Sequence, residues 1–314
     1  MDIARIAVVG SGYMGGGIAQ TLAMSGYPVV VVDADPAISR TAVDRLAEQA
    51  ERYEADGLVP SGAAAAVRAN LSSANSLAEA VSEADYVTEA VTEDLRVKQN
   101  VLRAISAAAP RGAIIATNTS AIRIADLATA VSHPGRFLGV HWFNPAPFLP
   151  LVELCGTDDE VVRSVERLLA SAGKVTVRVP DVAGFLGNRL QFALYKEALA
   201  IVEEGLATVE DVDTVVSNSF GYRLPLFGPI AVGDMAGLDV YLAAFGTLEE
   251  QYGARFRAPR SLAEMVEHGD LGIKSGGGFR QVSTDAAMGL AAYRDRGYRL
   301  MAQLRDQLGR APGL

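Results

Sequence analysis

Residues 6–19 read IAVVGSGYMGGGIA, and this stretch decides the fold of the first half of the chain. A short apolar run leads directly into three spaced glycines, Gly10, Gly12 and Gly15, and a helical pattern follows them. In a strand–turn–helix, the first such glycine permits a tight turn and the second lets the backbone approach a pyrophosphate. The third lets helix and strand pack closely. The spacing therefore predicts a dinucleotide-binding turn.

The next apolar run, VVVV, ends at Asp33, about where an acid contacts the adenosine ribose in such sites. A carboxylate here would repel the 2′-phosphate of NADP, and the residues that follow supply no arginine to receive that phosphate. We therefore expect NAD rather than NADP, with Tyr13 and Met14 as further cofactor-binding residues of the turn.

Strand and helix patterns alternate through residues 1–180, and each strand candidate is a nearly continuous apolar run. Such runs are typical of strands buried on both faces of a parallel sheet. The alternation predicts an α/β domain with a Rossmann-type doubly wound parallel sheet. The expected strands are 6–9, 29–32, 86–88, 113–116, 137–140 and 175–179, and the expected helices are 16–24, 36–54, 95–109, 122–130 and 160–172.

The pattern changes after Pro180, where helical patterns follow one another without a convincing strand. We expect two domains, an NAD-binding domain over 1–182 and an all-α C-terminal domain over 183–314. The apolar helices exceed what one small bundle can bury, so the second domain is expected to form a homodimer as well as to bind substrate. The expected helices are 185–204, 209–220, 232–252, 262–268 and 285–308.

Charge and composition exclude several classes of partner. A formal net charge of −9 disfavours nucleic acid, which needs a basic binding surface. No apolar run is long enough to span a bilayer, and the start of the chain lacks the pattern of a cleaved leader, so we expect a cytoplasmic protein without a membrane partner. Cys155 is the single cysteine, which excludes an internal disulfide and a thiolate cage, and no metal site is expected. Its apolar neighbours favour a small buried side chain.

Hydride transfer to a nicotinamide needs a base for the hydroxyl proton and donors that polarise the reacting oxygen. Among three histidines, His133 and His268 lie in patterns typical of solvated loops and helix ends. His141 ends an expected strand, at the sheet edge where ligands of open α/β sheets bind. Glu153, on another expected strand, could hold the second ring nitrogen. Position alone leaves catalysis and satisfied burial as equal alternatives for His141.

Several longer motifs follow one another along the chain. They are GSGYMGGGIA at 10–19, EAVTEDLRVKQ at 89–99, TNTSAI at 117–122, HWFNPAPFLPLVEL at 141–154, DVAGFLGNRL at 181–190, GPIAVGDMAGLDV at 228–240 and LGIKSGGGF at 271–279. In these motifs and in their order, the chain resembles the 3-hydroxyacyl-CoA dehydrogenase family from residue 3 to about 280. So many matches in order are far more specific than any single match.

The resemblance implies roles for four residues. His141 would be the acid/base, and Glu153 would orient it. Ser120 and Asn188 would bind the region of the reacting oxygen. Because Asn188 lies just past the expected domain boundary, we expect both domains to close the site, an arrangement that can exclude water from hydride transfer.

The same resemblance implies that Glu93 and Lys98 contact the ribose on the nicotinamide side. The alternative for this pair is a solvated ion pair near a helix start, which would contribute little. Ser120 has its own alternative as the N-cap of a helix over 121–129. Asn144-Pro145 is expected to be a turn that shapes the site.

Departures from the family concern the substrate. Pro150 stands near L-V-E where many fatty-acid members carry a charged residue, Trp142 follows the histidine, and the tail includes YRDRGYRL at 293–300. These features resemble the branch of L-gulonate 3-dehydrogenase and carnitine dehydrogenase, which act on free 3-hydroxy acids. The segment at 51–56 is more acidic than the phosphates of CoA would favour.

Three functions remain open. The first is NAD-dependent interconversion of a short (L)-3-hydroxyacyl-CoA, such as 3-hydroxybutyryl-CoA, and its 3-keto form. The second is a dehydrogenase of a free 3-hydroxy acid of the gulonate or carnitine type. The third is a non-catalytic NAD-binding or structural protein, since a lens crystallin is related to the family. The intact set of catalytic-type residues argues against the third.

Overall fold

A computed structural model describes residues 2–312, and the contacts within it divide the chain into two compact units, Met1–Tyr195 and Lys196–Leu314. Helix α8 (Gly187–Glu203) begins in the first unit and ends in the second. The domain boundary expected between 182 and 183 stays a prediction.

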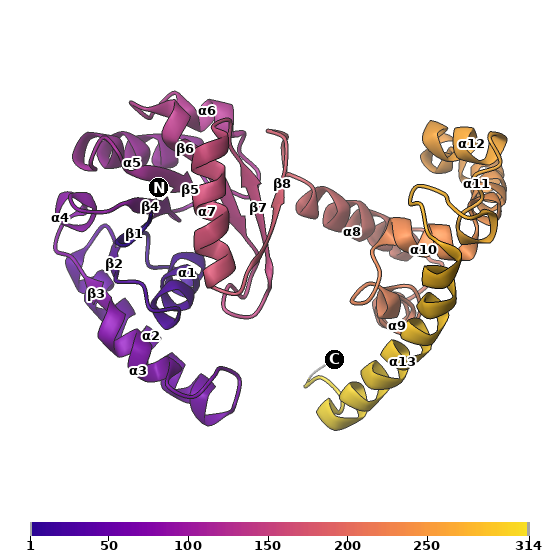
Figure 1. Cartoon of the computed structure of the whole chain (residues 1–314), viewed down its shortest axis with the longest axis horizontal. Coiled ribbons are helices and arrows are strands. Elements are labelled where there is room, and N and C mark those ends of the chain that lie inside the picture. The colour runs from indigo at the N-terminus through magenta and orange to yellow at the C-terminus, as the bar shows by residue number, and fades with distance from the viewer. Residues whose placement is uncertain (1, 313–314) are drawn as a thin grey trace. The chain divides into compact units, whose positions relative to one another are not determined.

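The first unit is built on an eight-stranded sheet with the order β3-β2-β1-β4-β5-β6-β7-β8 (Figure 1). Strands β1 to β6 are parallel, and the strand order reverses between β1 and β4, the point where open α/β sheets bind ligands. The expected doubly wound fold is confirmed. The strands are β1 (Ile6–Val9), β2 (Val29–Val32), β3 (Leu71–Ser73), β4 (Tyr86–Glu89), β5 (Ile114–Thr117), β6 (Phe137–Trp142), β7 (Leu151–Cys155) and β8 (Val175–Arg178).

Helices cover both faces of this sheet because successive residues of a buried strand point to opposite sides. Val8 belongs to one apolar core with side chains of α1, α2 and α7, while Ala7 and Val9 belong to a second core with α4, α5 and α6. The helices of this unit are α1 (Tyr13–Met24), α2 (Pro36–Ala55), α3 (Ala63–Asn70), α4 (Leu77–Val81), α5 (Leu95–Ala108), α6 (Ile124–Ala128) and α7 (Asp159–Ser171), with the 3-10 turn η1 (Pro134–Arg136).

Two strands depart from the fully parallel sheet that the sequence predicts. Strand β7 runs antiparallel to β6, and β8 runs parallel to β7. An antiparallel pair needs only a short connection, and residues 143–150 supply it. The register sets His141 directly opposite Glu153. Opposed residues point to the same face of a sheet, so the pairing brings these two side chains together.

Three short elements of the first unit were missed from the sequence, namely β3, α3 and α4. Two of the three residues of β3 are serines, which have no strand preference. Helix α4 has five residues, too few for a periodic pattern to show, and Ser76 caps it by accepting from the Glu79 amide. Helix α3 is short and consists mostly of alanines, so its buried side differs little in composition from its exposed side.

The second unit is helical. The expected single helix over 232–252 is wrong, because Gly237 breaks it with a φ of +105° into α10 and α11. Beyond β8, the described chain forms isolated bridges at Gly272–Gly277 and Gly277–Gln281 but no strand. The elements are α9 (Val209–Asn218), η2 (Gly221–Arg223), α10 (Pro229–Ala236), α11 (Leu238–Tyr252), η3 (Gly253–Phe256), α12 (Arg260–Glu267), η4 (Ile273–Ser275) and α13 (Thr284–Leu308).

Within residues 2–312, no single helix has both the length and the apolar composition needed to cross a membrane. One strongly bent pair, Pro229–Ala236 with Leu238–Phe256, meets these two criteria jointly.

Candidate active site

The turn between β1 and α1 has the geometry that a dinucleotide pyrophosphate requires. Gly10 has a φ of +102°, and a Cβ there would lie 2.7 Å from the Ala90 carbonyl oxygen, so only glycine fits. A Cβ on Gly12 would meet open space, and one on Gly15 would overlap with the Gly10 carbonyl. The N-cap of α1 makes no side-chain hydrogen bond, and its first turn holds no acid. The amide groups at this helix end can therefore receive phosphate oxygens, and the residues present fit NAD.

Asp33, just after β2, holds the same turn by hydrogen bonds. Its Oδ2 accepts hydrogen bonds from the Ser11 amide at 2.7 Å and from the Ser11 hydroxyl at 2.6 Å, and its Oδ1 accepts from the Ala34 amide. Burial alone would raise the pKa of this carboxyl, but these bonds outweigh it and hold the pKa below its usual value. The predicted ribose ligand is thus ionised and fixed beside the glycine turn.

His141 and Glu153 form a buried pair on the face of β6 and β7 that lines a cavity. Nδ1 of His141 lies 2.9 Å from Oε2 of Glu153, and the histidine is 5% exposed. An ionised carboxylate can only accept, so this contact puts a proton on Nδ1 and leaves Nε2 as the atom for proton exchange. The rings of Phe143 and Phe185 flank the imidazole at centroid distances of 4.6 and 5.6 Å.

The second oxygen of Glu153 holds the start of α8. Oε1 accepts from the amides of Leu186 and Gly187, at 3.0 and 2.9 Å. The preceding Phe185 has a φ of +48°, a conformation that costs a side-chain-bearing residue free energy and that its burial sustains. One carboxylate therefore fixes both the imidazole and the first turn of the helix that carries Asn188.

Ser120 lies in the loop after β5, and the Glu93 carboxylate accepts hydrogen bonds from several groups of this loop. Oε1 of Glu93 accepts from the Thr119 hydroxyl at 2.6 Å and from the amides of Ser120 and Ala121 at 2.9 and 3.1 Å. Its distance to the Ser120 hydroxyl is 3.4 Å. Burial alone would raise the pKa of Glu93, but the Thr119 bond, the nearby Lys98 charge and the two amides lower it.

The alternative that made Ser120 a helix N-cap is wrong. Helix α6 begins at Ile124, and its N-cap residue Arg123 makes no side-chain capping bond. The carboxylate of Asp181 serves this helix end instead, accepting from the amides of Ile124 and Ala125 at 2.7 and 2.8 Å. The Ser120 hydroxyl is therefore not engaged as a cap.

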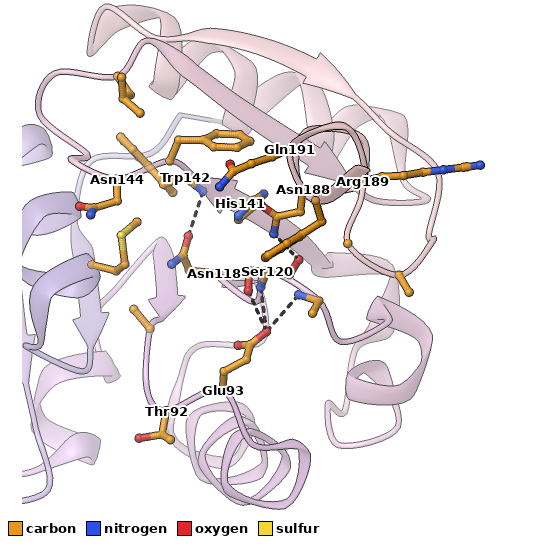
Figure 2. Close-up of a pocket in the computed structure, with 18 of the residues that line it drawn as sticks. Thr92, Glu93, Asn118, Ser120, His141, Trp142, Asn144, Asn188, Arg189 and Gln191 are labelled. Atoms are coloured by element: carbon orange, nitrogen blue, oxygen red, sulfur yellow. Dashed lines mark hydrogen bonds between the residues drawn. The ribbon is translucent and has the colours of Figure 1, made fainter. Parts of the chain in front are cut away.

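Asn188 lies on the first turn of α8, within the compact unit Met1–Tyr195. Its Nδ2 donates to the Ser120 carbonyl oxygen at 3.1 Å. Figure 2 shows its amide between His141 and Ser120. The first unit alone thus brings together the proton-transfer candidate and both candidates for holding the reacting oxygen.

Lys98 is buried rather than solvated, so the alternative of an exposed ion pair is wrong. Its ammonium is 1% exposed and lies 2.8 Å from Glu89 Oε1, 3.2 Å from the Val91 carbonyl and 3.3 Å from Glu93 Oε2. The ammonium donates hydrogen bonds to Glu89 and to the Val91 carbonyl, and its contact with Glu93 is an ion pair. The direct contact of Lys98 with a cofactor ribose stays a prediction, and in the structure Lys98 reaches the cavity through Glu93. Glu89 was not predicted as a site residue, although a carboxylate at the end of a buried strand indicates a buried partner.

His141, Ser120 and Asn188 line, together with Glu93, a cavity of about 1210 Å³ in the first unit (Figure 2). Among its described lining residues, Arg189 is the one lysine or arginine, and Figure 2 shows its side chain pointing away from the other labelled groups. The lining comprises Met14, Ala90, Val91, Thr92, Glu93, Asn118, Ser120, Ala121, His141, Trp142, Phe143, Asn144, Leu149, Ala183, Gly184, Asn188, Arg189, Gln191 and Phe192.

The rim segment after β6 is held by a buried lysine. Nζ of Lys174 donates to the carbonyl oxygens of Ala146 and Leu149, at 2.6 and 2.9 Å, and lies 5.5 Å from the centroid of the Trp142 ring. Burial lowers the pKa of this lysine. Asn144, the expected shaping residue, lines the cavity next to this segment.

The remaining candidates lie away from the cavity. The ring of His268 is exposed, and its Nδ1 is 2.7 Å from the Glu264 carbonyl oxygen. Cys155 is buried, as expected, and burial with the nearby Asp181 charge raises the pKa of its thiol to about 11. Within the described residues, no group of histidine, cysteine and acidic side chains is arranged to hold a metal ion.

Two family models match the chain almost end to end. Residues 5–182 match the 3-hydroxyacyl-CoA dehydrogenase NAD-binding domain, and residues 184–282 match the C-terminal domain of the same family. The chain extends beyond the second match, and the whole of α13 lies in this extension.

Individual relatives cover nearly the whole chain. A 5-formyl-3-hydroxy-2-methylpyridine 4-carboxylate 5-dehydrogenase of Mesorhizobium japonicum is 36% identical, over 94% of this chain and 96% of its own. A 3-hydroxybutyryl-CoA dehydrogenase of Mycobacterium tuberculosis is also 36% identical, over 88% of this chain and 98% of its own. The solved 3-hydroxyacyl-CoA dehydrogenase of Archaeoglobus fulgidus is 34% identical and superposes with a TM-score of 0.78, covering 97% of this chain and 99% of its own.

Proposed function

The chain belongs to the 3-hydroxyacyl-CoA dehydrogenase family, and we propose that it interconverts a short (L)-3-hydroxyacyl-CoA and its 3-keto form with His141 as the acid/base. It is an NAD-dependent oxidoreductase. The observation that carries the proposal is the buried His141–Glu153 pair beside Ser120 and Asn188 in one cavity. 3-Hydroxybutyryl-CoA is the first substrate to assay.

His141 moves the proton in this proposal. Bound NAD would supply the acceptor for the hydride of the carbinol carbon, and Nε2 of His141 takes the proton of the hydroxyl group. Glu153 accepts from Nδ1, which keeps Nε2 free of its proton before the reaction and stabilises the imidazolium that forms. In the reverse direction the same nitrogen returns the proton to the carbonyl oxygen.

Ser120 and Asn188 hold the reacting oxygen. The hydroxyl of Ser120 and the second amide proton of Asn188 are donors of the kind that stabilise charge developing on an oxygen. The bond from Asn188 to the Ser120 carbonyl keeps the two residues together before substrate arrives. Their positions are thus organised in advance, so little reorganisation is needed during the reaction.

The cofactor lies along the edge of the sheet in this proposal. The glycine turn binds the pyrophosphate, Asp33 binds the adenosine ribose, and Tyr13 and Met14 contact the dinucleotide from the first turn of α1. Glu93, which lines the cavity, binds the ribose on the nicotinamide side.

A free hydroxy acid is the second candidate substrate, and one observation favours it. CoA carries several phosphate charges, whereas the described lining of the cavity offers a single arginine, Arg189. The helical segment at 51–56 adds acids rather than bases. A substrate of the gulonate or carnitine type would need less positive charge.

A homodimer through the helical unit is also part of the proposal. Leu206, Val215 and Val240 each expose more than half of their side-chain surface in the single chain. Apolar side chains exposed in such numbers on one unit are typical of an interface. A monomer in analytical ultracentrifugation at micromolar concentration would contradict the dimer.

Steady-state assays with acetoacetyl-CoA and NADH, and with gulonate or carnitine and NAD, separate the candidates under one set of conditions. The thioester should give the highest kcat/KM. A higher value with either free acid would replace the first candidate by the second. Binding of NADH without turnover of any of the three would overturn both.

A further inference from the structure

Glu89 is a buried acid that none of the proposed catalytic steps uses. It ends β4 at the reversal of strand order and is 0% exposed. Its carboxylate accepts from the Val91 amide and the Lys98 ammonium, both at 2.8 Å, and from the Thr117 hydroxyl at 2.6 Å. An acid at this depth needs such partners, since an unpaired buried charge is costly.

Stability alone gives no reason for the Glu89–Lys98 pair. Desolvation of two charges largely offsets their attraction, and apolar residues of the same volume often serve as well. The pair instead connects to the cavity, because the same ammonium lies 3.3 Å from Oε2 of Glu93. Of the three residues Glu89, Lys98 and Glu93, it is Glu93 that lines the cavity.

The two carboxylate oxygens of Glu93 contact different groups. Oε2 faces Lys98, while Oε1 receives the Thr119 hydroxyl and the amides of Ser120 and Ala121. Figure 2 shows these bonds converging on one oxygen of Glu93 beside Ser120. A stronger pull from Lys98 on Glu93 would therefore compete with the bonds that hold the Ser120 loop.

We propose that Glu89 is a positioning residue, which holds back the Lys98 ammonium so that Glu93 stays bound to the Ser120 loop and presents its carboxylate to the cofactor. The inference rests on the proposed cofactor contact of Glu93. Without the Glu89 charge, Lys98 keeps one anionic partner, Glu93, and draws it away from residues 119–121. Cofactor binding then becomes weaker, and the Ser120 hydroxyl is displaced.

Glu89→Gln tests this, because glutamine keeps the shape and an acceptor oxygen while it removes the charge. We expect the Kd for NADH, measured by fluorescence titration, to rise about 10-fold. In a Glu93→Gln background the same change should alter Kd less than about 2-fold, since no carboxylate remains there for Lys98 to displace. Glu83→Gln, at an exposed acid paired with Arg5, is the matched control and should leave Kd unchanged.

Equal rises in Kd in both backgrounds would mean that Glu89 acts on the fold in general, and an unchanged Kd in the first background would mean that it does not act on Glu93. Either result overturns the proposal. If Glu89→Gln does not fold, Glu89→Asp decides, because its shorter side chain moves the carboxylate away from the Lys98 ammonium. A rise in Kd that disappears with Glu93→Gln is again required. NADH binding needs no substrate, so absence of turnover with every acyl substrate would refute the proposed reaction and leave this test intact.

Discussion

Nδ1 of His141 lies 2.9 Å from Oε2 of Glu153, and the two residues are direct partners across the antiparallel strands β6 and β7. The sheet register therefore sets the distance between the proposed base and its orienting acid. Backbone amides of residues 186 and 187 hold the other carboxylate oxygen. The carboxylate cannot rotate without breaking one of these contacts.

Glu153→Gln should lower kcat by roughly 10³-fold with little loss of folded protein, by analogy with the wrong tautomer that an amide imposes in a catalytic triad. The amide oxygen can still accept from residues 186 and 187, so the amide nitrogen must face Nδ1. The imidazole then carries its proton on Nε2 and cannot accept another there. Steady-state kinetics across pH test this, with the exposed Glu267→Gln as control. An unaltered pH–rate profile would contradict the role of Glu153.

His141→Ala should lower kcat by roughly 10²- to 10⁴-fold while the Kd for NADH stays near that of the unchanged protein. The imidazole supplies proton transfer, whereas the glycine turn and Asp33 bind the cofactor elsewhere. Turnover assays and fluorescence titration of NADH give the two values. His268→Ala, which removes an exposed ring, should change neither. Full activity of the His141 variant would remove His141 from the mechanism.

Asn188→Ala should lower kcat by roughly 100-fold, which is the usual loss when one donor to a reacting oxygen is removed. The variant also frees the Ser120 carbonyl, which accepts from the Asn188 amide. Asn218→Ala is the control, because Asn218 is also helical and its amide donates to a backbone carbonyl, that of Thr214, outside the cavity. Equal kcat values for the two variants would exclude Asn188 from oxygen binding.

Asp33→Asn should make the protein less stable at neutral pH, and the difference should shrink in acid. Burial alone would raise the pKa of Asp33, but the bonds from Ser11 and Ala34 outweigh it and keep this pKa below its ordinary value, so the ionised form favours the folded state. That stabilisation is complete above the unfolded pKa and is lost as the pH falls through the folded pKa. Thermal unfolding between pH 3 and 7 measures it, with Asp35→Asn as control. A constant difference in Tm over this range would refute the linkage.

Local sequence signals predicted the features that depend on local backbone geometry. The spacing of the three glycines predicted the turn after β1, and the position of Asp33 predicted the end of β2. The apolar runs predicted the central strands. Residues that meet across the sheet were harder to predict. The run around Glu153 is apolar, which indicates a buried strand but not its direction, and so its antiparallel pairing with β6 was not foreseen.

Glu89 shows the same limit in the site. It ends a short buried strand, and its partner Lys98 lies nine residues further on, after the start of α5. Only the packing of α5 against the sheet brings the ammonium to the carboxylate. The break at Gly237 was also not predicted, because helical patterns continue on both sides of it, although glycine is common where helices end.

Gly187 has a consequence for the space around the base. A Cβ at this position would overlap with the ring of Phe143, which packs 4.6 Å from the imidazole, centroid to centroid. Any larger residue there would have to displace the Phe143 ring, which lines the cavity beside His141. The shape of the space for a substrate therefore depends on the absence of a side chain at position 187.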